Sequence, residues 1–99
     1  MKTYEHPDLK EVSLVAAMNA LSDPCRLQII HALIKHQELA CNELPVEVAK
    51  ATLSHHIGVL REAGLIQTRV EGTKCLNSLR ESEFEVQFPG LLNLVKSQS

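Results

Sequence analysis

The chain has 99 residues, of which 44% are hydrophobic, 22% charged and 3% aromatic, and its formal net charge is −2. This is the composition of one ordinary small domain, and the charge excludes a globally basic nucleic-acid binder. A lone domain of this size buries only roughly 60–70% of its unfolded surface, which favours a homodimer. We find neither an apolar run long enough for a membrane span nor the apolar centre of a secretory signal. We therefore expect a cytoplasmic protein that does not contact a membrane.

Charge is unevenly distributed along the chain. Residues 1–49 hold four basic and seven acidic side chains, residues 50–80 hold five basic and two acidic ones, and residues 81–99 hold one basic and three acidic ones. The central segment is therefore locally basic, as a surface that contacts phosphate groups must be.

The first half of the chain shows helical patterns. Apolar side chains recur every three or four residues and predict a helix over 8–21. The pair Asp23-Pro24, an N-cap followed by a proline suited to a first turn, predicts a second helix over 24–36. Helical spacing is weaker over 40–49, where a proline interrupts the pattern, so we expect a short or distorted helix there.

The second half combines a helix, a hairpin and an apolar tail. A clear helical pattern over 51–63 ends before Gly64. Residues 66–79 alternate apolar and polar around a Glu71-Gly72 turn, which predicts a β-hairpin. A short apolar tail, 91–95, follows Pro89-Gly90, and its pattern fits equally well a core segment or a dimer contact.

The order of these elements, α-α-α-α-β-β-α, indicates a mostly α domain with a small β-hairpin, the winged helix-turn-helix class of DNA-binding domain. One buried stripe of the helix over 51–63 leaves small polar side chains exposed near its N-terminus, where hydroxyl and imidazole groups suit phosphates and base edges. Basic residues flank the hairpin tip. The predicted DNA contacts on the helix and hairpin are Ala51, Thr52, Ser54, His55, Arg69, Thr73 and Lys74.

Two segments, LSDPCRLQIIHAL and TLSHHIGVLREAGLIQTRVEGTK, strongly resemble the ArsR/SmtB family of bacterial winged-helix repressors, over roughly residues 15–80. The resemblance implies a homodimer joined through its first and last helices, with all 99 residues in one winged helix-turn-helix domain. It also implies a double-stranded operator with an inverted repeat and release by an inducer. By matching positions, Lys50 joins Thr52, Ser54 and His55 in the major groove, and residues 69–74 form the wing.

The metal-binding motifs of that family are not matched. Metal sensors of the family carry a Cys-x-Cys pair where this sequence has Ala40 and Asn42, and the terminal segment LLNLVKSQS offers no His, Asp, Glu or Cys ligand. His55 and His56 are adjacent and therefore point about 100° apart on a helix. We expect no metal and no cofactor, with His56 packed as a structural histidine.

Three cysteines far apart in the sequence argue against a disulfide framework and for reduced thiols. Cys25, at a helix start beside Arg26, has the setting of a thiol with a lowered pKa, although a small buried residue is the more common role of such a cysteine. Cys25 and Cys41 are candidate redox residues, although Cys41 has a weaker case than Cys25. Cys75 also has a weaker case and could point inward from its strand.

Three functions remain open. The first is a dimeric, sequence-specific DNA-binding repressor; the second is the same repressor controlled by thiol oxidation. The third is a protein-interaction module that keeps the fold and docks a partner through its apolar tail and acidic first half. A glycine-rich phosphate loop, a nucleophile elbow and a complete metal-ligand set are all missing from the sequence, so we do not expect an enzyme.

Overall fold

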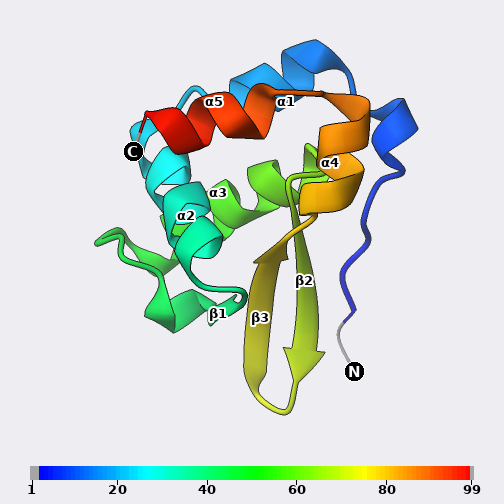
Figure 1. The fold of residues 1–99 in the computed structure, drawn as a ribbon. Coiled ribbons are helices and arrows are strands. Elements are labelled where there is room, and N and C mark those ends of the chain that lie inside the picture. Colours follow the sequence, from blue (N-terminus) through cyan, green and yellow to red (C-terminus); the bar gives the residue numbers. More distant parts are fainter. Residues whose placement is uncertain (1–2, 99) are drawn as a thin grey trace.

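Figure 1 shows the computed structural model, which describes residues 3–98. Helices pack around one core, and a β-hairpin projects from it. In chain order the elements are η1 (Leu9–Glu11), α1 (Leu14–Ala20), α2 (Pro24–Lys35), β1 (Leu39–Ala40), η2 (Cys41–Glu43), α3 (Lys50–Glu62), β2 (Ile66–Glu71), β3 (Lys74–Leu79), α4 (Glu81–Gln87) and α5 (Leu91–Ser97). The predicted winged-helix class is confirmed, while the predicted secondary structure is corrected in three segments of the chain.

The predicted helix over 8–21 is two elements, the 3-10 turn η1 and the helix α1. Each has its own N-cap, because the carboxylate of Asp8 accepts from the Lys10 amide and the hydroxyl of Ser13 accepts from the Ala16 amide, both at 3.0 Å. The backbone is extended at Val12 and at the second cap, Ser13, and this interrupts the helix. The apolar spacing alone did not predict this break.

Helices α2 and α3 begin and end within one residue of the predicted ranges. Between them, the short or distorted helix expected over 40–49 is confirmed only as the 3-10 turn η2, because the two-residue strand β1 precedes that turn and an irregular stretch around Pro45 follows it. Gly64, at φ +76°, ends α3; a Cβ atom there would lie 2.7 Å from Leu9 Cδ1. The glycine therefore sets both the turn and the packing of η1.

The sheet has the order β1-β3-β2 and is antiparallel throughout. Strands β2 and β3 form the predicted hairpin, with register Ile66↔Leu79 to Glu71↔Lys74 around Gly72. Strand β1 adds Leu39↔Asn77 and Ala40↔Leu76 on the other side of β3. The hairpin is the wing of the fold, and its outer part extends away from the helices (Figure 1).

The C-terminal segment holds two helices where one was expected, because Gly90 at φ +86° separates α4 from α5. Leu92 and Val95 of α5 are buried in the core, and His31 of α2 bonds the Val95 carbonyl at 3.0 Å. The apolar tail therefore contributes directly to the core. Across residues 3–98, the structure contains no helix of the length and apolarity that crossing a membrane requires.

Candidate nucleic-acid interface

Helix α3 has one buried and one exposed face. Ile57 and Leu60 are 2% and 0% exposed and fix the inner face against the core. The predicted DNA contacts of this helix all lie on the exposed side, namely Lys50, Ala51, Thr52, Ser54 and His55. The N-cap, Ala49, makes no side-chain capping bond, so the first-turn amides stay available to an outside acceptor such as a phosphate.

A buried arginine fixes the inner side of α3. Arg26 is 9% exposed and donates to the carbonyls of Ala20 at 2.8 Å and Asn19 at 3.1 Å, which ties α2 to the end of α1. Its Nη1 also lies 3.1 Å from Nδ1 of His56 on α3. The prediction that His56 is a packed structural residue is confirmed, and its partner is an arginine thirty positions earlier.

In the wing, Thr73 and Lys74 are exposed beside Gly72 at the tip. Arg69 is held differently. Its guanidinium binds both oxygens of Glu38 at 2.7 and 2.8 Å and one oxygen of Glu71 at 2.6 Å. These carboxylates raise the pKa of Arg69 and balance its charge, so Arg69 secures the wing to the segment after α2.

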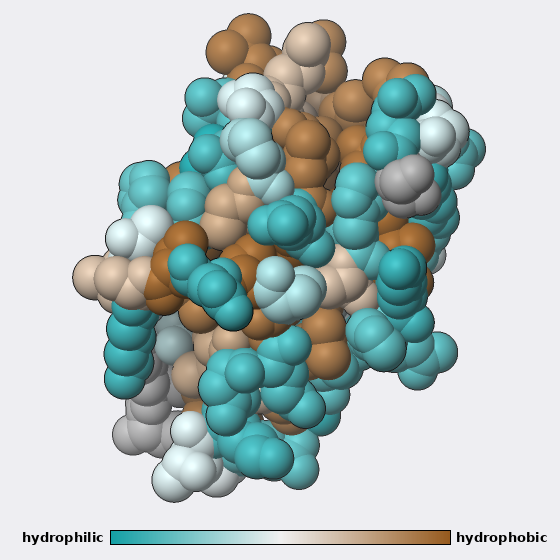
Figure 2. Space-filling view, turned by 90° about the vertical axis from the view of Figure 1, so that its left-hand side faces the viewer, coloured by the Kyte–Doolittle hydropathy of each residue, from teal (hydrophilic) through white to brown (hydrophobic). Residues whose placement is uncertain are grey.

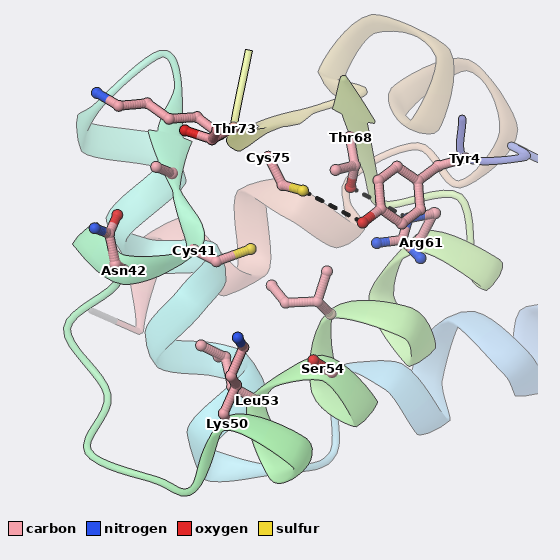
Figure 3. A pocket seen from close by; sticks show the side chains of 13 residues that line it. Tyr4, Cys41, Asn42, Lys50, Leu53, Ser54, Arg61, Thr68, Thr73 and Cys75 are labelled. Carbon is pink, nitrogen blue, oxygen red and sulfur yellow. Dashed lines mark hydrogen bonds between the residues drawn. The ribbon is translucent and has the colours of Figure 1, made fainter. Parts of the chain in front are cut away.

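A cavity of about 690 Å³ separates α3 from the wing. Figure 3 shows that side chains from both elements and from the β1–η2 segment face it. It is lined by Lys50 and Ser54 of α3 together with Thr73 and Lys74 of the wing, and Arg61 adds a third cation. Among the described residues that line it, none is acidic. The two predicted DNA-contacting elements therefore share one concave, positively charged surface.

Sequence reasoning missed a polar network along the floor of this cavity. The Arg61 side chain donates to the Thr68 hydroxyl at 3.2 Å, and that hydroxyl donates to Asn77, which is fully buried, at 2.8 Å. The Arg61 guanidinium also lies 4.2 Å from the centre of the Tyr4 ring, and the Tyr4 hydroxyl is 3.3 Å from the sulfur of Cys75. Separations of up to 71 residues explain why no local pattern reveals these contacts.

The two candidate redox cysteines lie in different surroundings. The predicted low thiol pKa of Cys25 is wrong, because burial and the neighbouring Asp23 carboxylate raise its pKa more than Arg26 lowers it. Cys41 instead lines the cavity, and the buried Asn77 amide lies 3.4 Å from its sulfur. Cys75 lines the same cavity, as its predicted inward orientation requires.

One cluster of side chains with metal-binding potential was also not predicted from the sequence. Ligand atoms of Asp23, Cys25 and His56 lie within 4.8 Å of one another, a combination of donors that Zn²⁺ accepts. The Arg26 guanidinium, bonded to Nδ1 of that histidine, disfavours a cation there. We therefore assign no metal site to this cluster.

An apolar surface lies at the end of the molecule away from the wing. Leu14, Val15 and Met18 of α1 are 55–77% exposed, and Leu94 of α5 is 58% exposed. Both helices lie at the upper end of Figure 1, where Figure 2 shows hydrophobic side chains gathered at the surface. Exposed apolar side chains gathered in this way are typical of an interaction surface.

Comparison with known proteins agrees with this geometry. A helix-turn-helix domain family matches residues 21–69. The chain is 43% identical to the HTH-type transcriptional regulator YceK of Bacillus subtilis, over 74% of this chain and 76% of the relative. It is 37% identical to an arsenical resistance operon repressor of Staphylococcus xylosus, over 71% of this chain and 66% of that relative. The crystal structure of the transcriptional repressor BigR from Xylella fastidiosa superimposes with a TM-score of 0.68 at 28% identity. The superposition covers 85% of this chain and 80% of the BigR chain.

A wing beside an exposed, locally basic helix, together with these relatives, defines a winged-helix transcriptional regulator and not an enzyme. The chain belongs to the ArsR/SmtB family of such regulators.

Proposed function

We propose that the chain is a homodimeric repressor that binds an operator with inverted half-sites and is released from it by an inducing signal. The observation that carries this proposal is the shared cavity, because Lys50 and Ser54 of α3 and Thr73 and Lys74 of the wing converge on it. A duplex seated across this surface would meet α3 in its major groove and the wing along the flanking backbone.

Base recognition is assigned to the exposed N-terminal half of α3. The hydroxyls of Thr52 and Ser54 and the imidazole of His55 can bond base edges or phosphates, and Ala51 lets the backbone approach closely. Lys50 and Lys74 contribute charge that stabilises binding to any sequence. Arg69 acts indirectly, by holding the wing through Glu38.

The dimer is assigned to the apolar end. A second copy of this chain is the occupant that fits, because an inverted operator requires two recognition helices related by a two-fold axis. Burying Val15 and Met18 against the same surface of a partner also compensates for the small core of one domain.

The experiment that tests DNA binding is selection from a random duplex pool with purified, reduced, metal-free protein. We expect enrichment of an inverted repeat whose half-sites lie about one helical turn apart, and affinity for the winners that falls steeply with salt. Equal binding to every sequence, or no binding above the level of an unrelated acidic protein, would overturn the proposal.

The dimer is tested by placing a charge in the apolar end. Val15→Lys should raise the dimer dissociation constant at least about tenfold, because a lysine ammonium would have to be desolvated in the contact. Val86→Lys on α4, where the valine is 83% exposed, is the matched control and should leave it unchanged. Sedimentation velocity across a concentration series measures both, and equal behaviour of the two variants would contradict the assignment.

A further inference from the structure

The cavity between α3 and the wing is lined by two cysteines, Cys41 and Cys75, that both adjoin the end of the β1–β3 pairing. Strands β1 and β3 pair Leu39 with Asn77 and Ala40 with Leu76. Cys41 and Cys75 each adjoin the last of these pairs: Cys41 follows Ala40 as the first residue of η2, and Cys75 precedes Leu76 on β3. Paired residues of antiparallel strands have Cα atoms about 4.5–5.5 Å apart, and a disulfide spans roughly 4.4–6.8 Å, so a small backbone adjustment brings the two neighbours of such a pair within disulfide reach.

Both side chains also lie on the same side of the sheet. Cys75 and Asn77 are two residues apart on β3, so their side chains project from the same face. The Asn77 amide lies 3.4 Å from Cys41 Sγ, which places the Cys41 sulfur on that face too. Figure 3 shows both thiols directed into the cavity, where the Tyr4 hydroxyl meets Cys75.

The surroundings suit reaction with a small oxidant. Both cysteines are free and half-buried, and the cavity that they line is large enough to admit a small molecule. The hydrogen bond with Cys75 is the largest of the effects that raise the pKa of Tyr4. The Tyr4 hydroxyl therefore keeps its proton at neutral pH and is available as a donor to the sulfur.

We propose that Cys41 and Cys75 form a reversible intrachain disulfide that links the helix-turn-helix to the wing, with a hydroperoxide as the oxidant. One thiolate attacks the hydroperoxide ROOH, its sulfur becomes a sulfenic acid and the alcohol ROH leaves after taking up a proton. The second thiolate attacks that sulfur and the hydroxyl leaves as water, so two thiols and ROOH give one disulfide, ROH and H₂O. A dithiol reductant reverses the step by exchange.

The bond has a direct consequence for the interface, and this consequence rests on the proposed DNA-binding function. Lys74 and Thr73 directly precede Cys75, and Lys50 and Ser54 line the opposite wall of the same cavity. Linking Cys75 to η2 moves the tip end of the wing relative to α3 and removes the Cys41 sulfur from the Asn77 amide. We expect the oxidised form to bind its operator at least about fivefold more weakly than the reduced form.

The test begins with wild-type protein treated with tert-butyl hydroperoxide, alkylated under denaturing conditions and mapped by peptide mass spectrometry. The expected result is a Cys41–Cys75 linked peptide that is lost on reduction and is formed equally by Cys25→Ser. Absence of that peptide, or linkage of either cysteine to Cys25 or to another chain, overturns the proposal.

Native aliquots of the oxidised and reduced proteins, set aside before alkylation, are titrated with the selected duplex by fluorescence anisotropy. Wild-type and Cys25→Ser should lose affinity on oxidation and regain it on reduction, while Cys41→Ser and Cys75→Ser should not respond. A linked peptide without a change in affinity would overturn the regulatory part. If neither redox state binds any duplex, the proposed function fails, while peptide mapping still decides whether the disulfide forms.

Discussion

One arginine holds the inner side of α3 and another holds the wing, and the two differ in their exposure to solvent. Arg26, behind α3, is buried and bonds two backbone carbonyls and a histidine. Arg69, in the wing, has a side chain that is 55% exposed and bonds two carboxylates. Buried groups without an alternative partner contribute strongly to stability, whereas exposed ion pairs contribute little. The comparison indicates a rigidly anchored α3 beside a wing that can adjust its position.

The largest expected effect is on the inner side of α3. Arg26→Ala removes three hydrogen bonds and leaves the Ala20 carbonyl buried without its partner, so we expect the free energy of unfolding to fall by about 2–4 kcal/mol. Urea denaturation followed by circular dichroism measures this. If Arg26→Ala lowered the free energy of unfolding no more than Arg69→Gln does, the proposed difference between the two arginines would be contradicted.

A smaller effect is expected at the junction of the wing and the N-terminal segment. His6 Nε2 accepts a hydrogen bond from the Thr68 amide of β2 at 3.0 Å. Desolvation, followed by the charges of Arg80 and Arg61, lowers the pKa of His6 below its ordinary 6.5. Because the unfolded chain takes up the proton first, this contribution is complete above about pH 6.5 and is lost as pH falls through the folded-state pKa.

Urea midpoints of wild-type protein and His6→Gln, measured from pH 7.5 to pH 5, test this linkage. The variant should show the weaker loss of stability on acidification. His36→Gln, at an exposed histidine after α2, is the matched control and should follow the wild type. Parallel curves for wild type and His6→Gln would contradict the assignment.

The smallest expected effect is that of the wing ion pairs. Arg69→Gln should lower the urea midpoint only slightly, and only at low ionic strength, because salt screens exposed charges. We also expect it to reduce DNA affinity less than Lys74→Gln does, since Arg69 is already paired with Glu38 and Glu71. An equal or greater loss of affinity would show that Arg69 exchanges its carboxylates for phosphate.

The elements that the sequence predicted correctly are those whose stabilising interactions join residues close together in the chain. Helices α2 and α3 and the β2–β3 hairpin were predicted because their signals, spacing, caps and turns, are local. The two-residue strand β1 has no local signal and exists through pairing with β3. The break before Ser13 had a local signal, a second N-cap, that the apolar spacing concealed.

In the candidate site too, features set by local patterns were predicted from the sequence, whereas contacts between distant residues were not. Exposure of the predicted α3 residues followed from helical periodicity and is confirmed. The pairing of Arg69 with Glu38 and the approach of His56 to Arg26 join residues about thirty positions apart, and only the folded chain brings them together. The pKa of Cys25 was misjudged because the prediction weighed the helix start and Arg26, but not burial and Asp23.

In the proposed complex, α3 and the wing contact DNA together through Lys50 and Lys74. The most direct test measures operator affinity against salt for Lys50→Gln/Lys74→Gln and for the control Lys10→Gln, at an exposed lysine in η1. We predict that the slope of log K against log salt becomes shallower by about 2 per protomer in the double variant, since each lost phosphate contact contributes about 0.9, and stays unchanged in the control. An unchanged slope in the double variant, or an equal change in the control, would contradict contact of both lysines with the DNA backbone.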